Sequence, residues 1–262
     1  MKICELSSVG WQRDRTILDE IDLTIQAGEH WVFLGPNGCG KSTLLKLMCL
    51  REWPTRGRLR LFGQDFPGHP VFSAQRRIGL FETRQIEGLI ENYPSLSILE
   101  AVLLGMNGTL PRYVSPTSEQ ILRATEMIQA ELPPALRPDS AISPLSAGER
   151  RRVLLLHCLA SRPDFLLLDE PFENLDIRAQ LHLQDQLMKT LPEIAASVLV
   201  VHRIQEIPPQ VSHAALMQRG RIIAAGVCED VLTSENVSRA YEIPLNLSVE
   251  RRPFRQYQWS RI

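Results

Sequence analysis

The amino-acid sequence predicts an α/β fold with a mainly parallel core sheet, an N-terminal antiparallel β-subdomain and a helical insertion. Three observations support this prediction. A glycine-rich loop at 35–43 lies between a short apolar run and a helical pattern. From residue 145 onward, apolar runs alternate with helical patterns, which is typical of a parallel sheet with helices on both faces. Between these parts, prolines divide 64–144 into short, mostly helical pieces.

The chain of 262 residues is expected to form a single domain, 1–262, because it is long enough to bury one large core. We expect four parts within this domain. They are 1–63 with the antiparallel β-subdomain and the glycine-rich loop, 64–144 with the helical insertion, 145–232 with the second half of the core, and 233–262 as a C-terminal extension.

The composition is that of an ordinary globular protein, and the formal net charge of −1 gives no field for holding nucleic acid. Charged residues follow the N-terminal Met at once, so no signal peptide is expected. No apolar run approaches the roughly 20 residues that span a bilayer. The five cysteines are scattered, which favours free thiols in a reducing compartment over disulfides or a metal site. We therefore expect a soluble, cytoplasmic protein that binds no nucleic acid.

The first part of the chain is predicted to consist of strands around the glycine-rich loop. Residues 21–25 alternate between apolar and polar side chains, as a half-buried strand does, and 58–62 repeat this pattern. The continuous apolar run 31–34 predicts a fully buried strand. Residues 42–48 follow the loop with a helical pattern whose leucines are available for an inward face.

The rest of the chain is predicted to be mainly helical and then α/β. Ser97 and Glu100 are spaced as a capping box, which predicts a helix that begins there. The tail 246–262 has alternating apolar residues that predict no definite element. The other predicted elements are helices at 118–132, 149–160, 178–191 and 233–241, buried strands at 165–168 and 197–201, and two short strands within 214–225.

The glycine-rich loop fits G-x-x-x-x-G-K-[ST], the phosphate-binding P-loop, at every fixed position. Its glycines let the backbone turn tightly, and its N–H groups and the start of the next helix point at an anion. Lys41 is expected to reach the β- and γ-phosphates of a nucleoside triphosphate, and the Ser42 hydroxyl to ligate Mg²⁺. The fold is therefore predicted to be that of a P-loop NTPase, whose nucleotide-binding residues are Gly35, Pro36, Asn37, Gly38, Cys39, Gly40, Lys41, Ser42 and Thr43.

A second motif follows the buried strand 165–168. A P-loop alone does not choose between kinases, GTPases, helicases and transport ATPases. Asp169 ends this strand, where its carboxylate lies beside the P-loop and can hold Mg²⁺ through water. Glu170, one residue later, is placed to act as general base on the attacking water. The pair indicates hydrolysis rather than binding alone.

The third motif is the segment 145–149, Leu-Ser-Ala-Gly-Glu, which precedes a basic helical stretch. Ser146 and Gly148 at a helix N-terminus form another anion-binding surface. With the three motifs in this order, the chain resembles the ATP-binding subunit of an ABC (ATP-binding cassette) transporter across nearly its whole length. The segment 145–149 is similar to the family's signature sequence, except that Ala147 stands where glycine is usual.

The resemblance implies ATP and Mg²⁺ as cofactors and a head-to-tail homodimer with two ATP molecules at its interface. Ser146 and Gly148 of one subunit would contact the γ-phosphate of the ATP that the other subunit holds. The signature residues that would act across the interface are Ser146, Ala147, Gly148 and Glu149.

Further residues receive roles from the same resemblance. The segment 173–176, which ends at Asp176, looks like the family's D-loop, which crosses the dimer interface. His202 looks like the switch histidine that hydrogen-bonds the γ-phosphate. Trp11 is the candidate for the aromatic residue that stacks on the adenine, and a structural tryptophan is the alternative.

The family also has a glutamine that contacts Mg²⁺ and joins the ATP site to the helical insertion. Counting from Ile78 places it near Thr83, which is not a glutamine, so Gln85 is the candidate for this role. The departure leaves open how Mg²⁺ is ligated on this side and how the site is coupled to a transport partner.

Together these features predict an ATPase that powers a membrane transporter. A separate transmembrane permease would dock against 64–144, and the chain would lie on the inner face of the cell membrane without contacting the cargo. The segments 28–31, 61–63 and 202–209 resemble a molybdenum-transport-like branch of these ATPases.

Two other functions remain as alternatives. One is a soluble single-cassette ABC ATPase that acts on nucleic acid or ribosomes, although such relatives usually carry two cassettes or a long coiled coil. The other is a nucleotide-binding regulator without turnover, which the presence of both Lys41 and Glu170 disfavours.

Overall fold

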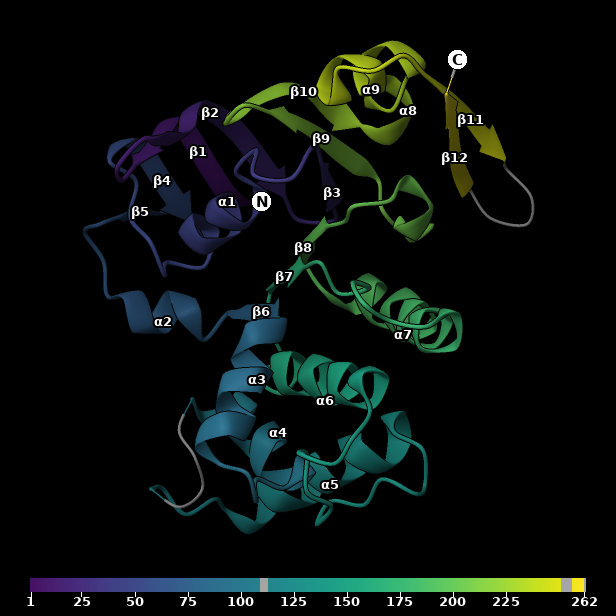
Figure 1. Cartoon of the computed structure of the whole chain (residues 1–262). Coiled ribbons are helices and arrows are strands. Elements are labelled where there is room, and N and C mark those ends of the chain that lie inside the picture. Colours follow the sequence, from purple (N-terminus) through teal and green to yellow (C-terminus); the bar gives the residue numbers. More distant parts are fainter. Residues whose placement is uncertain (109–112, 251–255, 262) are drawn as a thin grey trace.

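The computed structural model describes residues 1–108, 113–250 and 256–261 (Figure 1). In these ranges the strands form a four-stranded sheet in the order β2-β1-β4-β5, a six-stranded sheet in the order β10-β9-β3-β8-β7-β6, and a hairpin of β11 and β12. The predicted α/β class, with a mainly parallel core sheet and an antiparallel N-terminal sheet, is confirmed.

The four-stranded sheet is antiparallel throughout. Its inward side chains alternate with exposed ones, so that Leu18, Ile21 and Ile25 of the second strand are fully buried. The predicted strand at 21–25 is thus part of a longer strand. The strands are β1 Lys2–Gln12, β2 Thr16–Gln26, β4 Arg56–Leu61 and β5 Gln64–Phe66.

The central strands of the six-stranded sheet are buried on both faces, which explains their continuous apolar runs. In β3, Val32 belongs to one hydrophobic core, whereas its neighbours Trp31 and Phe33 belong to the other. Only the edge strand β10 runs antiparallel to its neighbour. The strands are β3 His30–Leu34, β6 Ile78–Glu82, β7 Phe165–Asp169, β8 Ala196–Val200, β9 His213–Gln218 and β10 Arg221–Val227.

Different layers cover the two faces of the core sheet. Helix α1, Lys41–Met48, packs together with the antiparallel sheet in the core that contains Phe33. The other core contains buried residues of α4 Ile98–Asn107, α5 Ser118–Glu131, α6 Ala147–Leu159 and α7 Ile177–Thr190. Figure 1 shows α3 (Thr83–Asn92), α4, α5 and α6 gathered on one side of the molecule, away from the antiparallel sheet and the C-terminal helices.

The prediction that the helical insertion begins at residue 64 is wrong. Residues 64–66 form an edge strand of the antiparallel sheet, and β6 (78–82) pairs in parallel with β7. Only the short helix α2, Val71–Gln75, lies between them. Strand β6 has a short, glycine-containing apolar run, and its partner β7 follows more than eighty residues later in the sequence. Local pattern therefore does not identify it. We propose a helical part that begins at α3.

Helices α4 and α6 approach closely. A Cβ atom at Gly105 of α4 would overlap the backbone carbonyl oxygen of His157 in α6. One turn earlier, His157 Nδ1 donates a hydrogen bond of 2.8 Å to the carbonyl oxygen of Ala101. The capping box predicted at Ser97 and Glu100 is present at the start of α4, and similar boxes begin α5 and α6.

The C-terminal extension packs beside the core sheet. Helix α8, Cys228–Val231, precedes the extension, which contains α9 Ser234–Tyr241, β11 Leu245–Glu250 and β12 Gln256–Arg261. Tyr241 meets Trp259 of the hairpin edge to face, with ring centroids 5.3 Å apart. The alternating tail therefore forms an antiparallel hairpin. The residues 251–255 and 262 of the predicted tail lie outside the described residues.

Two short 3₁₀ turns, Leu191–Glu193 and Ile204–Glu206, precede and follow β8. All five cysteines are buried free thiols, as expected. Among the described helices, none combines the length and the apolarity that crossing a membrane requires.

Candidate functional site

The P-loop connects β3 to α1, at the carboxyl end of the core sheet. Gly40, the residue before α1, has a φ of 109°, and a Cβ there would lie 2.6 Å from a methyl carbon of Leu18. Glycine is therefore required by both conformation and space. The Lys41 ammonium is buried and donates hydrogen bonds to the carbonyl oxygens of Gly35 (2.7 Å) and Pro36 (3.1 Å). The loop is thus closed over its own lysine.

A pocket of about 340 Å³ lies beside this loop. It brings the P-loop together with Glu170 and His202, which come from the ends of β7 and β8. Three further residues, Arg15, Ile17 and Glu173, complete a pocket lined by Arg15, Ile17, Asn37, Gly38, Gly40, Lys41, Ser42, Thr43, Glu170, Glu173 and His202. A cavity that joins a phosphate-binding loop to a carboxylate and an imidazole suits phosphoryl transfer.

The side chains of Ser42 and Asp169 are in direct contact. The Ser42 hydroxyl donates a hydrogen bond of 3.1 Å to Asp169 Oδ1. The pKa of Asp169 is raised to about 6. Burial is the largest cause, the hydrogen bond from Ser42 opposes it, and the negative charges of Glu170 and Glu82 add to the increase. Two oxygen donors at this distance are the ligand type that Mg²⁺ takes, so the residues present fit a magnesium ion.

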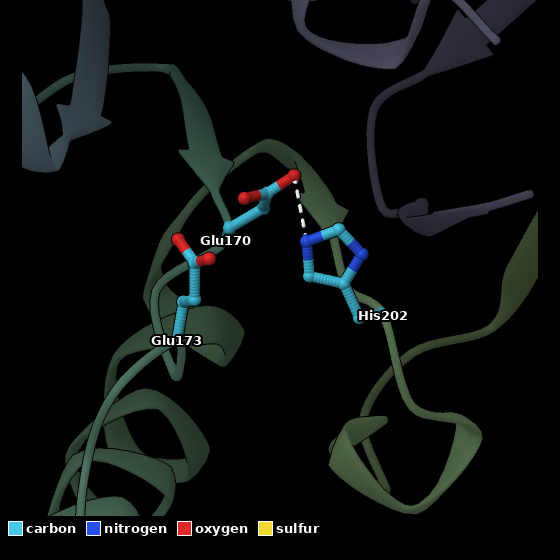
Figure 2. Close-up of side chains that lie close together, drawn as sticks. All are labelled: Glu170, Glu173 and His202. Atoms are coloured by element: carbon cyan, nitrogen blue, oxygen red, sulfur yellow. Dashed lines mark ion pairs between the residues drawn. The ribbon is translucent and has the colours of Figure 1, made fainter. Parts of the chain in front are cut away.

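Glu170 and His202 form an ion pair, with His202 Nε2 2.9 Å from Glu170 Oε1 (Figure 2). Glu170 has a φ of 51°, a left-handed conformation that is uncommon for a residue other than glycine, and its N–H donates to the carbonyl oxygen of Val200. Both side chains are partly exposed, at 25% for Glu170 and 30% for His202. The carboxylate is therefore held at the pocket and remains open to water.

Gln85 does not lie at the predicted position. Its amide nitrogen donates to His157 Nε2 at 3.2 Å, and its amide oxygen accepts from Arg51 at 3.4 Å. Because Gln85 belongs to α3, one turn beyond the sheet, its side chain points toward the helices and not toward Ser42 and Asp169.

The sheet register places Glu82 beside Asp169. Glu82 ends β6 directly opposite Asp169 of β7, and its carboxylate accepts a hydrogen bond of 2.7 Å from Arg51. Arg51 thus connects the acidic end of the core sheet with Gln85, which in turn contacts His157 of α6.

The signature segment lies at the start of α6. The Ser146 hydroxyl accepts the backbone N–H of Glu149 at 3.3 Å and donates to the Glu149 carboxylate at 2.7 Å. The bonds that the Glu149 carboxylate accepts from the hydroxyl and the backbone N–H of Ser146 lower its pKa. Ser146 and Gly148 are not among the residues that line the pocket beside the P-loop of the same chain. A role at an ATP site would therefore need a second copy.

Two other predicted residues occupy defined positions. Asp176 is the N-cap of α7, where its carboxylate accepts the N–H of Ala179 at 2.8 Å. Trp11 is partly buried near the end of β1 and packs against the core beneath the antiparallel sheet. The structure does not bring Trp11 to the pocket, where Arg15 and Ile17 provide the nearby wall.

Sequence reasoning placed Glu173 only in the D-loop segment, not at the pocket, and it did not single out Arg151. The buried guanidinium of Arg151, on α6, donates a hydrogen bond of 3.0 Å to the carbonyl oxygen of Glu173. Burial lowers the pKa of Arg151, and the negative charges of Glu87, Glu173 and Glu170 oppose that shift. The only signal in the sequence is spacing: Glu173 follows Glu170 by three residues, which places both on one side of a tight turn.

Comparisons with known proteins agree with these observations. The model of the ABC transporter family matches residues 18–173. An uncharacterized ABC transporter ATP-binding protein of Bacillus subtilis is 31% identical over 257 residues, which cover 96% of this chain and 96% of that protein. Other relatives are named as ATP-binding proteins for transport of zinc (Treponema pallidum, 31% identical) or import of molybdate and tungstate (Pyrococcus horikoshii, 29% identical).

Solved structures show the same fold. A chain of an inward-facing ABC transporter, described as of proposed metal-chelate type, superposes with a TM-score of 0.81 over 99% of this chain and 98% of its own length, at 21% identity. An ATP-binding cassette solved as a dimer after hydrolysis, with ADP and phosphate bound, has a TM-score of 0.71 and 25% identity over 86% of this chain and 98% of its own length.

The motifs, the pocket that joins the P-loop to Glu170 and His202, and the similarity over most of the chain lead to the same conclusion. The chain belongs to the ABC transporter family, as an ATP-binding ATPase.

Proposed function

We propose that this chain hydrolyses ATP as one half of a head-to-tail homodimer and thereby powers a transporter whose permease is a separate polypeptide. The observation that carries the proposal is the pocket that joins the P-loop to Glu170 and His202. The family relationship and the solved dimer of a related cassette support it. In this proposal the protein is cytoplasmic and reaches the membrane only through its permease.

The roles of the P-loop residues follow from their positions. The Lys41 ammonium, which now binds the carbonyl oxygens of its own loop, would exchange these contacts for the β- and γ-phosphate oxygens. Ser42 and Asp169 are the residues that would hold Mg²⁺, which neutralises phosphate charge when bound. Glu82, opposite Asp169, adds a third carboxylate near this position.

Glu170 and His202 would have different roles in the attack on the γ-phosphate. The Glu170 carboxylate would accept a proton from the attacking water, and His202 Nε2 would turn from Glu170 to the γ-phosphate. The turn is short because the ion pair already lies at the wall of the nucleotide pocket. Ser146 and Gly148 of a second copy would then close the site over the γ-phosphate.

The decisive test is Glu170→Gln. The amide cannot accept the proton, so turnover should fall by about a hundredfold or more, while ATP binding and ATP-dependent dimerisation persist. Phosphate release measures the first, and size-exclusion chromatography with ATP measures the second. Glu91→Gln, an exposed position on α3, is the matched control and should hydrolyse ATP normally. Unchanged turnover in Glu170→Gln would remove the base from the proposal.

A groove between the core sheet and the helical part is the proposed docking position for the permease. Its volume is about 530 Å³, and it contains the side chain of Phe72, which is 63% exposed and lies on α2. The remaining walls come from the end of α1, from β6 and from the end of α4. A short amphipathic helix of a permease fits a groove of this kind.

Phe72→Asp tests this docking position. The charge should abolish co-purification with membrane proteins and leave the ATPase activity of the isolated chain unchanged, because Phe72 lies outside the nucleotide pocket. If the wild-type chain recovers no membrane protein and instead binds nucleic acid with steep salt dependence, transport is the wrong assignment. The cargo is set by the permease, in agreement with the different cargoes that the relatives' names carry.

A further inference from the structure

The turn after Glu170 brings a third potential metal ligand to the ion pair with His202. One ligating atom each of Glu170, Glu173 and His202 lies within 4.8 Å of the other two. Figure 2 shows the two carboxylates and the imidazole converging from the end of β7, the following turn and the end of β8. Glu173 is exposed and the other two side chains are partly exposed, so a cation from solution can reach all three.

The backbone holds these groups in place. The N–H of Glu173 donates to the carbonyl oxygen of Glu170 at 3.2 Å, which closes the turn. On the other side, buried Arg151 donates to the carbonyl oxygen of Glu173 at 3.0 Å. The position of the third carboxylate is therefore determined by the core helix α6 and not by a free loop.

We propose that Glu170, Glu173 and His202 form a binding site for a late first-row divalent cation such as Zn²⁺, and that the bound cation blocks ATP hydrolysis. Two carboxylates and one imidazole are a protein ligand set that zinc accepts, with water as the fourth ligand. Mg²⁺ prefers oxygen ligands only, so the imidazole separates this site from the Ser42–Asp169 position.

The distances between the ligand atoms allow such an ion to bind after small movements of the side chains. Two ligands at tetrahedral zinc stand about 3.3 Å apart, given zinc–ligand bonds of about 2.0 to 2.1 Å. The Glu170–His202 pair at 2.9 Å needs to open slightly, and Glu173 needs to move inward from at most 4.8 Å. A glutamate side chain that is exposed makes this movement by rotating its own bonds.

The charges of the two carboxylates also favour binding of a cation at this site. Two carboxylates this close repel one another, and a divalent cation between them removes the repulsion. The positive groups on this side of the molecule, buried Arg151 behind the turn and Lys41 and Arg15 across the pocket, moderate the affinity. A reversible, regulatory affinity follows, because no thiolate ligand is present in the cluster.

Inhibition follows from the two residues that the ion occupies. A Glu170 carboxylate bound to a cation is a poor proton acceptor, and His202 Nε2 bound to the same cation has no hydrogen for the γ-phosphate. This consequence rests on the proposed catalytic function, whereas the binding itself does not. The two can therefore be tested separately.

The first arm measures binding without nucleotide. Zn²⁺ is titrated into the whole protein in competition with a chromophoric chelator, and Co²⁺ binding is followed by its visible absorption. The wild type should bind one cation, and Glu173→Gln should weaken it about tenfold or more because one ligand is lost. His202→Gln should remove both the zinc binding and the cobalt absorption band, and Glu91→Gln should match the wild type. Equal affinity in Glu173→Gln, His202→Gln and wild type overturns the site.

The second arm measures ATP hydrolysis at constant Mg²⁺ and ATP with free Zn²⁺ set by a chelator buffer. With each protein's rate expressed relative to its own rate without Zn²⁺, Glu173→Gln should need about ten times more Zn²⁺ for half-inhibition than wild type or Glu91→Gln. Zinc–nucleotide complexes affect all three proteins alike. Inhibition of Glu173→Gln at the wild-type concentration contradicts the proposal. Absence of any ATPase activity in the wild type would contradict the proposed function, and the binding arm would still decide the cation site.

Discussion

At the scale of single residues, the carboxylate of Asp169 has a strongly raised pKa at the candidate site. Its pKa is raised to about 6 because the strand that carries it is buried and because Glu170 and Glu82 add negative charge. A protonated carboxyl cannot ligate a cation, so the metal must displace a proton at low pH. The ordinary carboxylate of the sequence motif thus becomes, in the folded chain, a group that titrates close to neutral pH.

The raised pKa of Asp169 predicts that Mg²⁺ improves ATP binding less at low pH. The pH below which this improvement decreases is called the acid limit. Above about pH 6 Asp169 is ionised, and the gain in ATP affinity on adding Mg²⁺ should be constant. Below the pKa of Asp169, the gain in ATP affinity should decrease by up to about tenfold for each pH unit, because each bound ion then releases one proton. Isothermal titration of the wild-type protein with a non-hydrolysable ATP analogue, with and without Mg²⁺, measures the gain at each pH.

Glu82→Gln provides the comparison for this prediction. Removing a negative charge beside Asp169 lowers its pKa, so the acid limit should move to lower pH. Protonation of ATP itself is the same for both proteins and cancels in the difference. A limit that stays at the same pH would mean that Asp169 is not the titrating group.

At the scale of elements, the contact between α4 and α6 determines how the helical part sits on the core. The backbones meet at Gly105 and His157, where no side chain fits between them. Burial lowers the pKa of His157, and the neutral ring donates from Nδ1 to Ala101 and accepts from Gln85 at Nε2. Through Arg51, this polar chain reaches Glu82 at the acidic end of the sheet.

Gly105→Ala should therefore destabilise the protein. The added methyl group would overlap the carbonyl oxygen of His157, and the strain should lower the free energy of unfolding by about 1 to 3 kcal/mol. Urea denaturation followed by circular dichroism measures this change.

Gly88→Ala is the matched control. Gly88 lies in α3, and a Cβ there would meet nothing within 4 Å. The substitution should raise the free energy of unfolding by about 0.5 to 1 kcal/mol, because alanine loses less backbone entropy in a helix than glycine. If both variants shift stability in the same direction, the close approach of α4 and α6 is not the cause.

At the scale of the whole molecule, the signature segment does not line the nucleotide pocket of its own chain. The nucleotide pocket is built from the ends of β3, β7 and β8, whereas Ser146 begins α6 and does not line it. A single copy therefore presents a P-loop without a signature segment over it. The proposed dimer supplies what is missing, and two identical copies complete two sites by symmetry.

Mixing two inactive variants tests this arrangement. Ser146→Asp keeps a side chain that can cap α6 but places a negative charge toward the γ-phosphate held by the partner, so the variant should be inactive. Lys41→Ala should be inactive because it loses the phosphate contact. An equal mixture should regain activity, because the mixed dimer contains one intact site. Phosphate release measures the recovery.

Ser146→Asn is the control for size and capping, since asparagine caps a helix without adding charge. It should retain much more activity than Ser146→Asp. A mixture of Lys41→Ala with Ser146→Asp that stays inactive, while each protein still dimerises with the wild type, would exclude sites shared between two copies.

The sequence by itself determined the local features: the P-loop, the buried strands, the capping boxes and the chemical types of Lys41, Asp169 and Glu170. Each of these depends on neighbours within a few residues, where spacing and side-chain type carry the information. The tertiary structure alone decided that β6 joins the core sheet, that Glu82 rather than Gln85 faces Asp169, and that Glu173 meets His202. Those positions depend on pairing between segments far apart in the chain, and one residue of register decides which side chain faces the metal-binding end of the sheet.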